Sequence, residues 1–185
     1  MILGLTGSFG AGKGVAVDYL TQDKGFKHFS ARAFIVEEIQ RRGLVADRDT
    51  MASVGNDIRA VHGSTYIIES LFQQALQAGG DAIVESIREV AGVHFIQQHG
   101  GFVIGIDADP VVRFNRALKR GSETDHVSFE TWLAQERAES NPDDPTKQDI
   151  FGALNASDVT IQNDGTLDEF YRKIDAVLER FVTGS

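Results

Sequence analysis

The sequence predicts an α/β fold in which a parallel β-sheet of about five strands is flanked by helices. Two observations lead to this prediction. Five short apolar runs recur along the chain, and the stretches between them carry apolar residues at helical spacing, such as Ile35 with Ile39 and Ile67 with Leu71. Strands that alternate with helices are typical of βαβ units, whose strands are parallel.

Each expected element follows from its own segment. The five expected strands are the runs "ILGLT" (2–6), "FKHFS" (26–30), "DAIVES" (81–86), "GFVIGID" (101–107) and "SDVTIQN" (157–163). After the fourth run, Asp109 and Pro110 indicate a helix start, because Asp caps helices and Pro suits the first helical position. The polar segment 121–149 surrounds an amphipathic run, "FETWLAQERA", and interrupts the alternation. We expect either a mobile lid or an ordinary surface excursion there.

The composition fits one globular domain over residues 1–185. Apolar residues make up 42% of the chain and charged residues 24%, without a signature of disorder. The lack of Cys excludes disulfides, thiolate metal sites and a cysteine nucleophile. A net charge of −9 argues against nucleic acid as the main partner, since a phosphodiester track needs a broad basic surface. No signal peptide or membrane-spanning run is found, so we expect a cytoplasmic protein without a membrane partner.

A phosphate-binding loop is predicted directly after the first strand. Gly7, Gly12 and Lys13 satisfy the pattern G-x-x-x-x-G-K, and a helical run follows them. The glycines let backbone N–H groups turn inward around phosphates, the helix N-terminus adds positive potential, and Lys13 reaches the terminal phosphates. The alternative is a glycine-rich turn with a surface lysine. The residues expected to bind the phosphates of ATP are Gly7, Ser8, Phe9, Gly10, Ala11, Gly12, Lys13, Gly14 and Val15.

The run "GSFGAGKG" resembles the P-loop of adenylate kinases and other nucleoside monophosphate kinases, in which glycine commonly follows the lysine. Looser similarities to these kinases and to dephospho-coenzyme A kinases follow in order: "HFSARAFIVEEIQRRG", "AIVESIREV", "ADPVVRFNRALKRG" and "SDVTIQNDGTLDEF". The resemblance spans nearly the whole chain. It implies a P-loop NTPase three-layer α/β sandwich, with a helical acceptor-binding region near 31–79 and a lid near 121–149.

The chain departs from both kinase patterns. The monophosphate kinases usually place Thr two residues after the lysine, whereas this chain has Val15, so no hydroxyl directly follows Lys13 to bind magnesium. Adenylate kinases usually carry Gly-Asp, with Arg three residues beyond the Asp, where Arg32, Ala33 and Val36 stand here. Dephospho-coenzyme A kinases usually have Asp in place of Arg32. The acceptor's identity therefore stays open.

Glu85, at the end of the third apolar run, is the strongest candidate to organise magnesium. The resemblance implies that the first and third strands are neighbours, which would bring Glu85 to the P-loop, at a position where the family has Asp. Glu is one methylene longer, so we expect it to bind the ion directly or through a water. The alternative is a carboxylate that pairs with Arg88 and orders the loop.

Arginines are the expected partners of the transferred phosphate. Arg113, Arg116 and Arg120 are spaced i, i+3, i+7, which places three guanidinium groups on one helical face. Such groups match phosphate oxygens, although a solvated helix face is the alternative. The family comparison favours Arg116 and Arg120 as the catalytic pair. Arg113 and Arg137 are further candidates for contacts at the lid.

A second set of residues is expected to bind the acceptor. Arg88 follows the third strand at the carboxyl edge of the sheet, where open α/β sheets bind ligands, and is the favoured partner of an acceptor phosphate. Arg59 is a weaker candidate for the same phosphate. Arg32 and Ser30 follow the second strand; a helix cap is the alternative role for Ser30.

The sequence thus predicts an ATP- and magnesium-dependent kinase that transfers the γ-phosphoryl group to a small nucleotide acceptor. The first candidate acceptor is a nucleoside or deoxynucleoside monophosphate. The second is a ribose hydroxyl, as in dephospho-coenzyme A kinases. A different class also stays open, namely a nucleotide-binding switch or assembly factor that hydrolyses ATP without a small acceptor.

Overall fold

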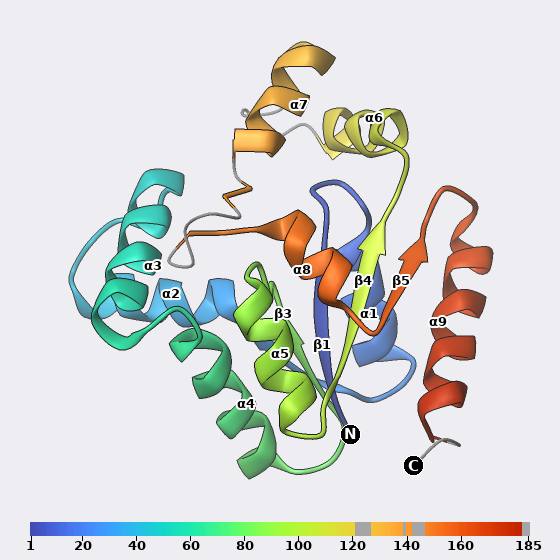
Figure 1. Ribbon diagram of the computed structural model, residues 1–185, viewed down its shortest axis with the longest axis horizontal. Coiled ribbons are helices and arrows are strands. Elements are labelled where there is room, and N and C mark those ends of the chain that lie inside the picture. Colours follow the sequence, from blue (N-terminus) through green and yellow to red (C-terminus); the bar gives the residue numbers. More distant parts are fainter. Residues whose placement is uncertain (121–126, 139, 142–146, 183–185) are drawn as a thin grey trace.

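Strands and helices alternate along the chain as the apolar runs predicted (Figure 1). The computed structural model describes residues 1–120, 127–138, 140–141 and 147–182. The strands are β1 (Ile2–Gly7), β2 (Lys27–Ser30), β3 (Ala82–Glu85), β4 (Phe102–Asp107) and β5 (Val159–Gln162). The helices are α1 (Lys13–Gln22), α2 (Ala31–Arg41), α3 (Arg48–His62), α4 (Tyr66–Ala78), α5 (Val90–Gln98), α6 (Pro110–Arg120), α7 (Phe129–Ala138), α8 (Ile150–Ala156) and α9 (Leu167–Val182). All five expected strands are therefore confirmed.

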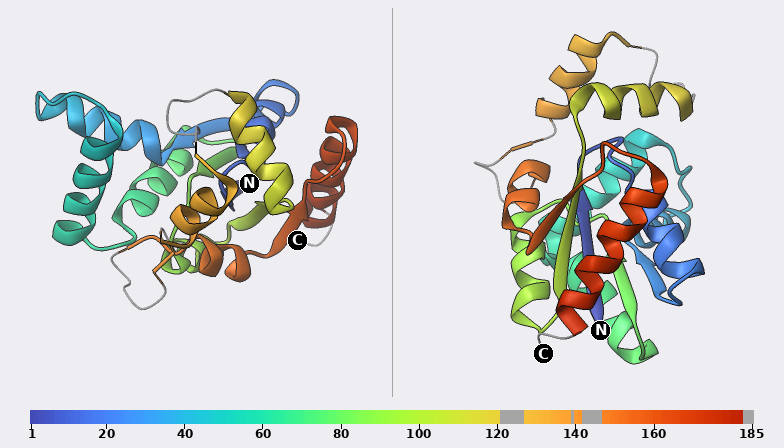
Figure 2. Two further views of the ribbon diagram at one scale, coloured as in Figure 1. Left: turned by 90° about the horizontal axis from the view of Figure 1, so that it is seen from above. Right: turned by 90° about the vertical axis from the view of Figure 1, so that its right-hand side faces the viewer.

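The strands form one sheet in the order β2-β3-β1-β4-β5. In the central strand β1, Leu5 lies opposite Glu85 of β3, and Gly7 lies opposite Ile106 of β4. Because all neighbouring strands are parallel, their carboxyl ends meet at the same edge of the sheet. Helices α6 and α7 lie across this edge, whereas Met1 lies at the opposite end of the molecule (Figures 1 and 2). Ligands of open α/β sheets bind at the carboxyl edge.

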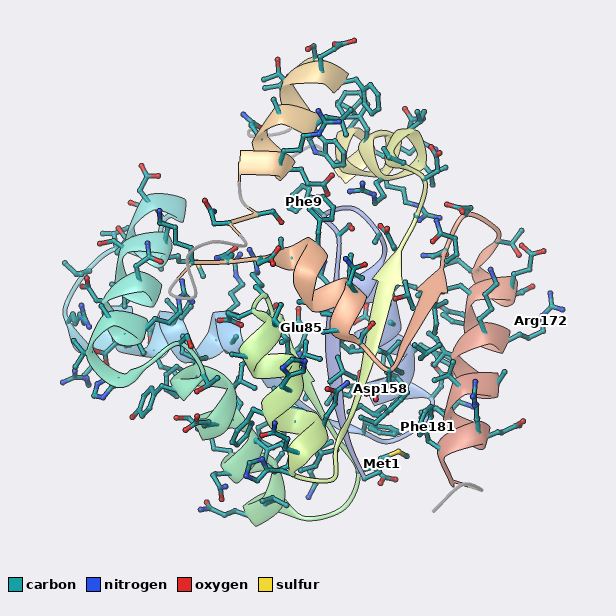
Figure 3. All side chains as sticks on the ribbon, in the orientation of Figure 1. Met1, Phe9, Glu85, Asp158, Arg172 and Phe181 are labelled. Carbon is teal, nitrogen blue, oxygen red and sulfur yellow. The ribbon has the colours of Figure 1, made fainter. Side chains whose placement is uncertain are left out.

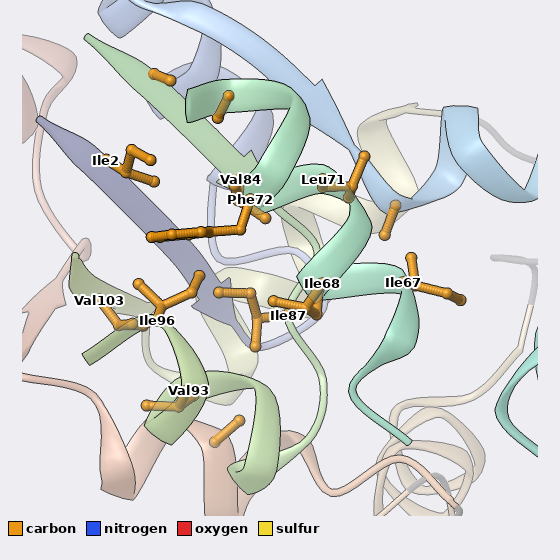
Figure 4. Packing of buried hydrophobic residues seen from close by; sticks show 14 of the residues in the cluster. Ile2, Ile67, Ile68, Leu71, Phe72, Val84, Ile87, Val93, Ile96 and Val103 are labelled. Atoms are coloured by element: carbon orange, nitrogen blue, oxygen red, sulfur yellow. The ribbon is translucent and has the colours of Figure 1, made fainter. Parts of the chain in front are cut away.

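Helices cover both faces of the sheet, as the predicted three-layer sandwich requires. On one face, α4, α5 and α8 pack over the sheet and enclose side chains such as Val84 and Val103 (Figure 4). Phe72 of α4 is 2% exposed in this core, and burial of such a side chain stabilises the fold by about 1.5–3 kcal/mol. On the other face, α1 and α9 cover Leu3 and Leu5 of β1. The central strand is thus fixed from both sides.

The peripheral helices lie in the segments for which the sequence predicted helical structure. Segment 31–79, the expected acceptor region, forms α2, α3 and α4, and α2 and α4 contact the edge strand β2. Helix α6 begins at Pro110, and the Asp109 carboxylate accepts a hydrogen bond from the Val111 N–H at 2.8 Å, as predicted. The expected lid at 121–149 lies partly outside the described residues; its described part contains α7. In the part of the chain that the structure describes, no helix is both long and apolar enough to span a bilayer.

Candidate active site

The loop between β1 and α1 has a backbone that requires glycine at defined positions. Gly7 and Gly10 have φ angles of 150° and 79°, which residues with a side chain rarely adopt. A Cβ atom at Gly7 would lie 2.2 Å from the Ile106 carbonyl oxygen. One at Gly10 would lie 2.5 Å from the Arg113 carbonyl oxygen. The loop therefore packs closely against β4 and α6.

The loop amides fall into two groups. The Ser8 N–H donates to the Ile106 carbonyl at 3.2 Å, and the Ala11 N–H donates to the Ser8 carbonyl at 3.3 Å. Among the described residues, the N–H groups of Gly10 and Gly12 donate to no protein acceptor. The N–H groups of Gly14 and Val15, in the first turn of α1, have no acceptor within the helix, as is usual at a helix N-terminus. Gly10, Gly12 and the start of α1 thus offer the amides that an anion can use.

Lys13 begins α1 and reaches back over the loop. Its ammonium nitrogen Nζ donates to the carbonyl oxygens of Gly7 at 2.6 Å and Ser8 at 2.9 Å. These bonds hold a positive charge at the loop. Phosphate oxygens are stronger partners of an ammonium group than neutral carbonyls, because both members of the pair are then charged.

The two positions after Lys13 differ in their surroundings. Gly14 is exposed, and a Cβ atom there would meet no heavy atom within 4 Å. Crowding therefore does not exclude the Ser or Thr that follows the lysine in the general P-loop pattern G-x-x-x-x-G-K-[ST]. Val15 is half-buried, and its side chain packs on the core between α1, α9 and the sheet. The backbone of Val15 is the part that a nucleotide could contact.

Glu85 ends β3, beside the strand that leads into the loop (Figure 3). Its carboxylate bonds with His28 Nε2 at 3.0 Å and accepts a hydrogen bond from Ser86 Oγ at 2.9 Å. The hydrogen bond with His28 lowers the pKa of the Glu85 carboxyl, against the opposing effect of burial. Among the described residues, Arg88 is not a partner of this carboxylate, so the expected alternative pair is not formed there.

The residues at the carboxyl edge of the sheet are compatible with a magnesium ion that is bound mainly by the phosphates of a nucleotide. No group of three or more His, Cys, Asp or Glu side chains that could bind a metal is found in the described ranges. Magnesium in kinases does not need such a cage, because it keeps several waters and is bound by one or two carboxylates plus substrate phosphates. The ionised, half-buried carboxylate of Glu85 supplies that kind of ligand.

Arg59 and Arg88, both predicted at the acceptor, both contact the buried Glu89, Arg59 with its guanidinium and Arg88 with its backbone N–H. Arg59 is 6% exposed, and its Nη1 lies 3.8 Å from Oε1 of the equally buried Glu89. Arg88 donates its backbone N–H to Glu89 Oε2 at 3.1 Å and its Nη1 to Gln148 Oε1 at 3.0 Å. Burial raises the pKa of the Glu89 carboxyl, and burial lowers that of the Arg59 guanidinium. One carboxylate is thus accompanied by two arginines, of which the Arg88 guanidinium contacts the neutral Gln148, so this region carries an excess positive charge.

Ser30 and Arg32 lie at the end of β2 and the start of α2. Ser30 is the N-cap of α2, and its Oγ accepts a hydrogen bond from the Ala33 N–H at 3.4 Å. Ser30 also lies opposite Glu85 in the sheet register. Arg32 is exposed in the first turn of α2. The structure therefore gives Ser30 the capping role that was the alternative, and brings it beside the magnesium candidate.

The predicted arginine face of α6 divides into a buried and a half-buried part. Arg113 is 3% exposed, and its Nε donates to the Ala108 carbonyl at 3.0 Å. Its Nη1 donates to the Phe9 carbonyl at 3.2 Å and to the Glu136 carboxylate of α7. The guanidinium also lies over the Trp132 ring, 5.1 Å from its centre. Arg113 therefore binds protein groups of the loop and of α7.

The other three arginine candidates lie nearer the surface or outside the described residues. Arg116 is half-buried and donates from Nη1 to the Asn163 carbonyl at 2.8 Å. Arg120 ends α6, and its side chain is not among the described ones. Arg137 is exposed on α7. Phe9, 42% exposed on the loop, has its ring 6.4 Å from the Trp132 ring of α7 (Figure 3).

The residues of this region that were not singled out from the sequence include His28, Glu136 and Asn163. Asn163 follows β5 directly, and its Nδ2 donates to the Ala11 carbonyl of the loop at 2.8 Å. Its place at a strand's carboxyl end is a signal that could have pointed to it. His28 lies on an edge strand and Glu136 in a polar helix, where sequence patterns do not distinguish functional residues from solvated ones.

The sheet order, the glycine loop and the lysine together define a three-layer α/β P-loop fold. A family model described as an AAA domain matches residues 6–133, and the chain belongs to this family.

Curated relatives of similar length bear names that state no reaction. A UPF0200 protein of Staphylothermus marinus is 25% identical over 182 residues, which cover 96% of this chain and 91% of the relative. A UPF0200 protein of Methanosarcina acetivorans is 29% identical over 152 residues, which cover 80% and 78% of the two chains.

Solved structures with this fold include kinases. The protein TT1252 of Thermus thermophilus is similar with a TM-score of 0.65, at 19% identity and 97% coverage of both chains. A gluconokinase of Sinorhizobium meliloti has a TM-score of 0.59, at 15% identity, and covers 98% of this chain and 93% of its own. A shikimate kinase of Bacteroides thetaiotaomicron has a TM-score of 0.58, at 12% identity and coverages of 97% and 98%. At these identities the likeness concerns the fold.

Proposed function

We propose that this protein is an ATP-dependent kinase that phosphorylates a nucleoside or deoxynucleoside monophosphate. The observation that carries the proposal is that Arg88, which follows β3, and Arg59 of α3 both contact Glu89, next to the strand that leads into the P-loop. This arrangement supports the proposal of a cationic acceptor site beside the proposed triphosphate site. Phosphoryl transfer needs such positioning of two anions more than it needs covalent chemistry by the protein.

On the donor side, the amides of Gly10, Gly12 and the start of α1 bind the β- and γ-phosphates. Lys13 then donates its hydrogen bonds to phosphate oxygens in place of the two loop carbonyls. Glu85 holds magnesium directly or through a water. The ion, when bound, neutralises phosphate charge. The hydrogen bond from Ser86 and the bond with His28 orient the Glu85 carboxylate for this role.

On the acceptor side, Arg88 binds the monophosphate, with Arg59 behind it. Arg59 is held by Glu89 and by the Asn56 side-chain oxygen, which accepts from its Nη2 at 2.8 Å. A monophosphate dianion matches an excess positive charge better than a neutral sugar does, because charge-assisted hydrogen bonds are about twice as strong as neutral ones. The exposed Arg32 is a further contact for the acceptor.

In the transfer step, an oxygen of the acceptor phosphate forms a bond to the γ-phosphorus while the bond to the β–γ bridging oxygen breaks, and ADP leaves. Arg116 and Arg120 of α6 stabilise the charge that spreads over the moving group, and Arg137 of α7 approaches from the lid. An acceptor phosphate is already deprotonated near neutral pH, so this reaction needs no general base.

A hydroxyl acceptor, as in dephospho-coenzyme A kinases, is the second candidate. The observation that favours it is the bond between Glu85 and His28 at the same edge of the sheet. A hydroxyl must lose its proton as it attacks, and a carboxylate or imidazole in reach of it can accept that proton.

One acceptor screen tests both candidates. ADP formation from ATP and magnesium is followed with a panel of nucleoside and deoxynucleoside monophosphates, with dephospho-coenzyme A, and without any acceptor, each beside the Lys13→Ala variant. We expect formation of ADP and a nucleoside diphosphate only when a monophosphate is present. Dephospho-coenzyme A as the sole stimulating acceptor would select the second candidate. ADP formed at the same rate without an acceptor would refute both and indicate a switch or assembly ATPase.

A further inference from the structure

Two side chains from outside the P-loop bind alternate carbonyl groups of its backbone. Arg113 of α6 donates from Nη1 to the Phe9 carbonyl at 3.2 Å. Asn163, which follows β5, donates from Nδ2 to the Ala11 carbonyl at 2.8 Å. These donors are 104 and 152 residues away from the acceptors in sequence, so the contacts depend on the assembled fold.

The two bonds fix the orientation of two peptide planes. A trans peptide is planar, and its C=O and N–H groups point in opposite directions; the described residues contain no cis peptide bond. A Phe9 carbonyl turned toward Arg113 therefore turns the Gly10 N–H away from Arg113. In the same way, an Ala11 carbonyl turned toward Asn163 turns the Gly12 N–H away from Asn163. Gly10 and Gly12 are the loop residues whose amides have no acceptor among the described residues.

Both donors are themselves held firmly. Arg113 is 3% exposed; besides its bonds to Ala108 and Glu136, its Nε lies 3.4 Å from Asp107 Oδ1. Asn163 is 6% exposed, and its backbone N–H donates to the Asp107 carbonyl at 2.7 Å. A buried side chain with several fixed partners keeps one rotamer, and so it can dictate the orientation of the carbonyl it binds.

We infer that Arg113 and Asn163 are positioning residues that set the Gly10 and Gly12 amides toward the phosphates. This inference rests on the proposed function, and it gives Arg113 a role different from direct contact with phosphate. It also explains why Gly12 must lack a side chain, since a Cβ atom there would lie 2.5 Å from Asn163 Nδ2 and would displace the donor. Preorganised amides bind an anion without reorganising when it arrives.

The test measures binding of inorganic tripolyphosphate and of ATP to the full chain by calorimetry, which needs no acceptor. Asn163→Asp keeps the shape but replaces the donor by an oxygen that repels the Ala11 carbonyl. Arg113→Lys keeps the positive charge, but lysine has one side-chain nitrogen in place of Nε and Nη1, through which Arg113 binds its partners. Asn155→Asp and Arg172→Lys are matched controls at exposed positions on α8 and α9.

We expect Asn163→Asp and Arg113→Lys to bind both ligands at least about tenfold more weakly, a loss of about 1.4 kcal/mol, at unchanged far-ultraviolet circular dichroism. The controls should match the wild type. Asn163→Ala, which removes the donor without adding repulsion, should fall between the wild type and Asn163→Asp; this order is the readout that a general loss of stability would not produce.

Wild-type affinity for tripolyphosphate in the folded Asn163→Asp and Arg113→Lys variants would overturn the inference and leave the proposed function intact. A wild-type chain that binds neither ATP nor tripolyphosphate would overturn the proposed function and the inference with it.

Discussion

Replacing Arg88 with alanine tests the acceptor side of the proposed site, and the structure indicates that the loop around it would stay in place. The backbone of Arg88 is anchored independently of its side chain: its N–H donates to Glu89, and its carbonyl accepts from the Asp149 N–H at 2.7 Å. The side chain is half-buried, and its described bond is to Gln148. Arg88→Ala therefore removes a guanidinium group with little change in the surrounding chain.

The expected loss follows from one charge-assisted contact. A hydrogen bond to a charged group contributes about 1.5–3 kcal/mol, which corresponds to a loss of about ten- to a hundredfold in acceptor affinity. The value should lie toward the lower end, because Arg59 remains nearby and still carries positive charge. ATP affinity should change by less than about threefold, since none of the described P-loop contacts involves Arg88.

The assay is steady-state kinetics with the acceptor that the screen identifies, in which KM is determined separately for acceptor and for ATP. Arg172→Ala is the control, because Arg172 projects from α9 at the surface (Figure 3). If Arg88→Ala raises the KM for ATP and leaves that for the acceptor unchanged, the assignment of the two sides of the site is refuted.

Three further predictions concern the donor side and pH. Lys13→Ala should abolish transfer at an unchanged circular dichroism spectrum, because its ammonium contacts loop carbonyls and not the core; equal activity would contradict the P-loop assignment. Glu85→Gln should lower kcat by about a hundredfold and raise the magnesium requirement; wild-type kcat with an unshifted magnesium titration would remove Glu85 from the mechanism. Hydrogen bonds from two neighbouring arginines lower the pKa of Glu38 to about 2. Its contribution to stability is thus complete above the ordinary carboxyl pKa and is lost as the pH falls toward 2; an NMR titration that finds an ordinary pKa would contradict these bonds.

The strands and the P-loop could be predicted because their signals are local. Each strand is a short apolar run bounded by polar or glycine residues, and the backbone of the loop needs glycine at positions such as Gly7 and Gly10. The neighbouring placement of β1 and β3 came from the family resemblance, and the sheet order confirms it.

The role of Arg113 could not be predicted from its spacing. The i, i+3, i+7 pattern places three arginines on one face of α6, but it does not indicate which part of that face α7 covers. Trp132 and Glu136 of α7 bury Arg113, whereas Arg116 stays half-buried. The Asn163 contact was missed for a related reason: it joins residues far apart in sequence, and no local pattern encodes such a pair.

Trp132 is the single tryptophan of the chain. Its indole lies where the P-loop, through Phe9, meets α7, and it is covered by the Arg113 guanidinium. Intrinsic fluorescence excited at the red edge of protein absorption therefore comes from one known point, without mutagenesis or labelling. We expect the emission spectrum of the unmodified protein to depend on the contact between the P-loop and α7, and so to change when a phosphate binds the loop.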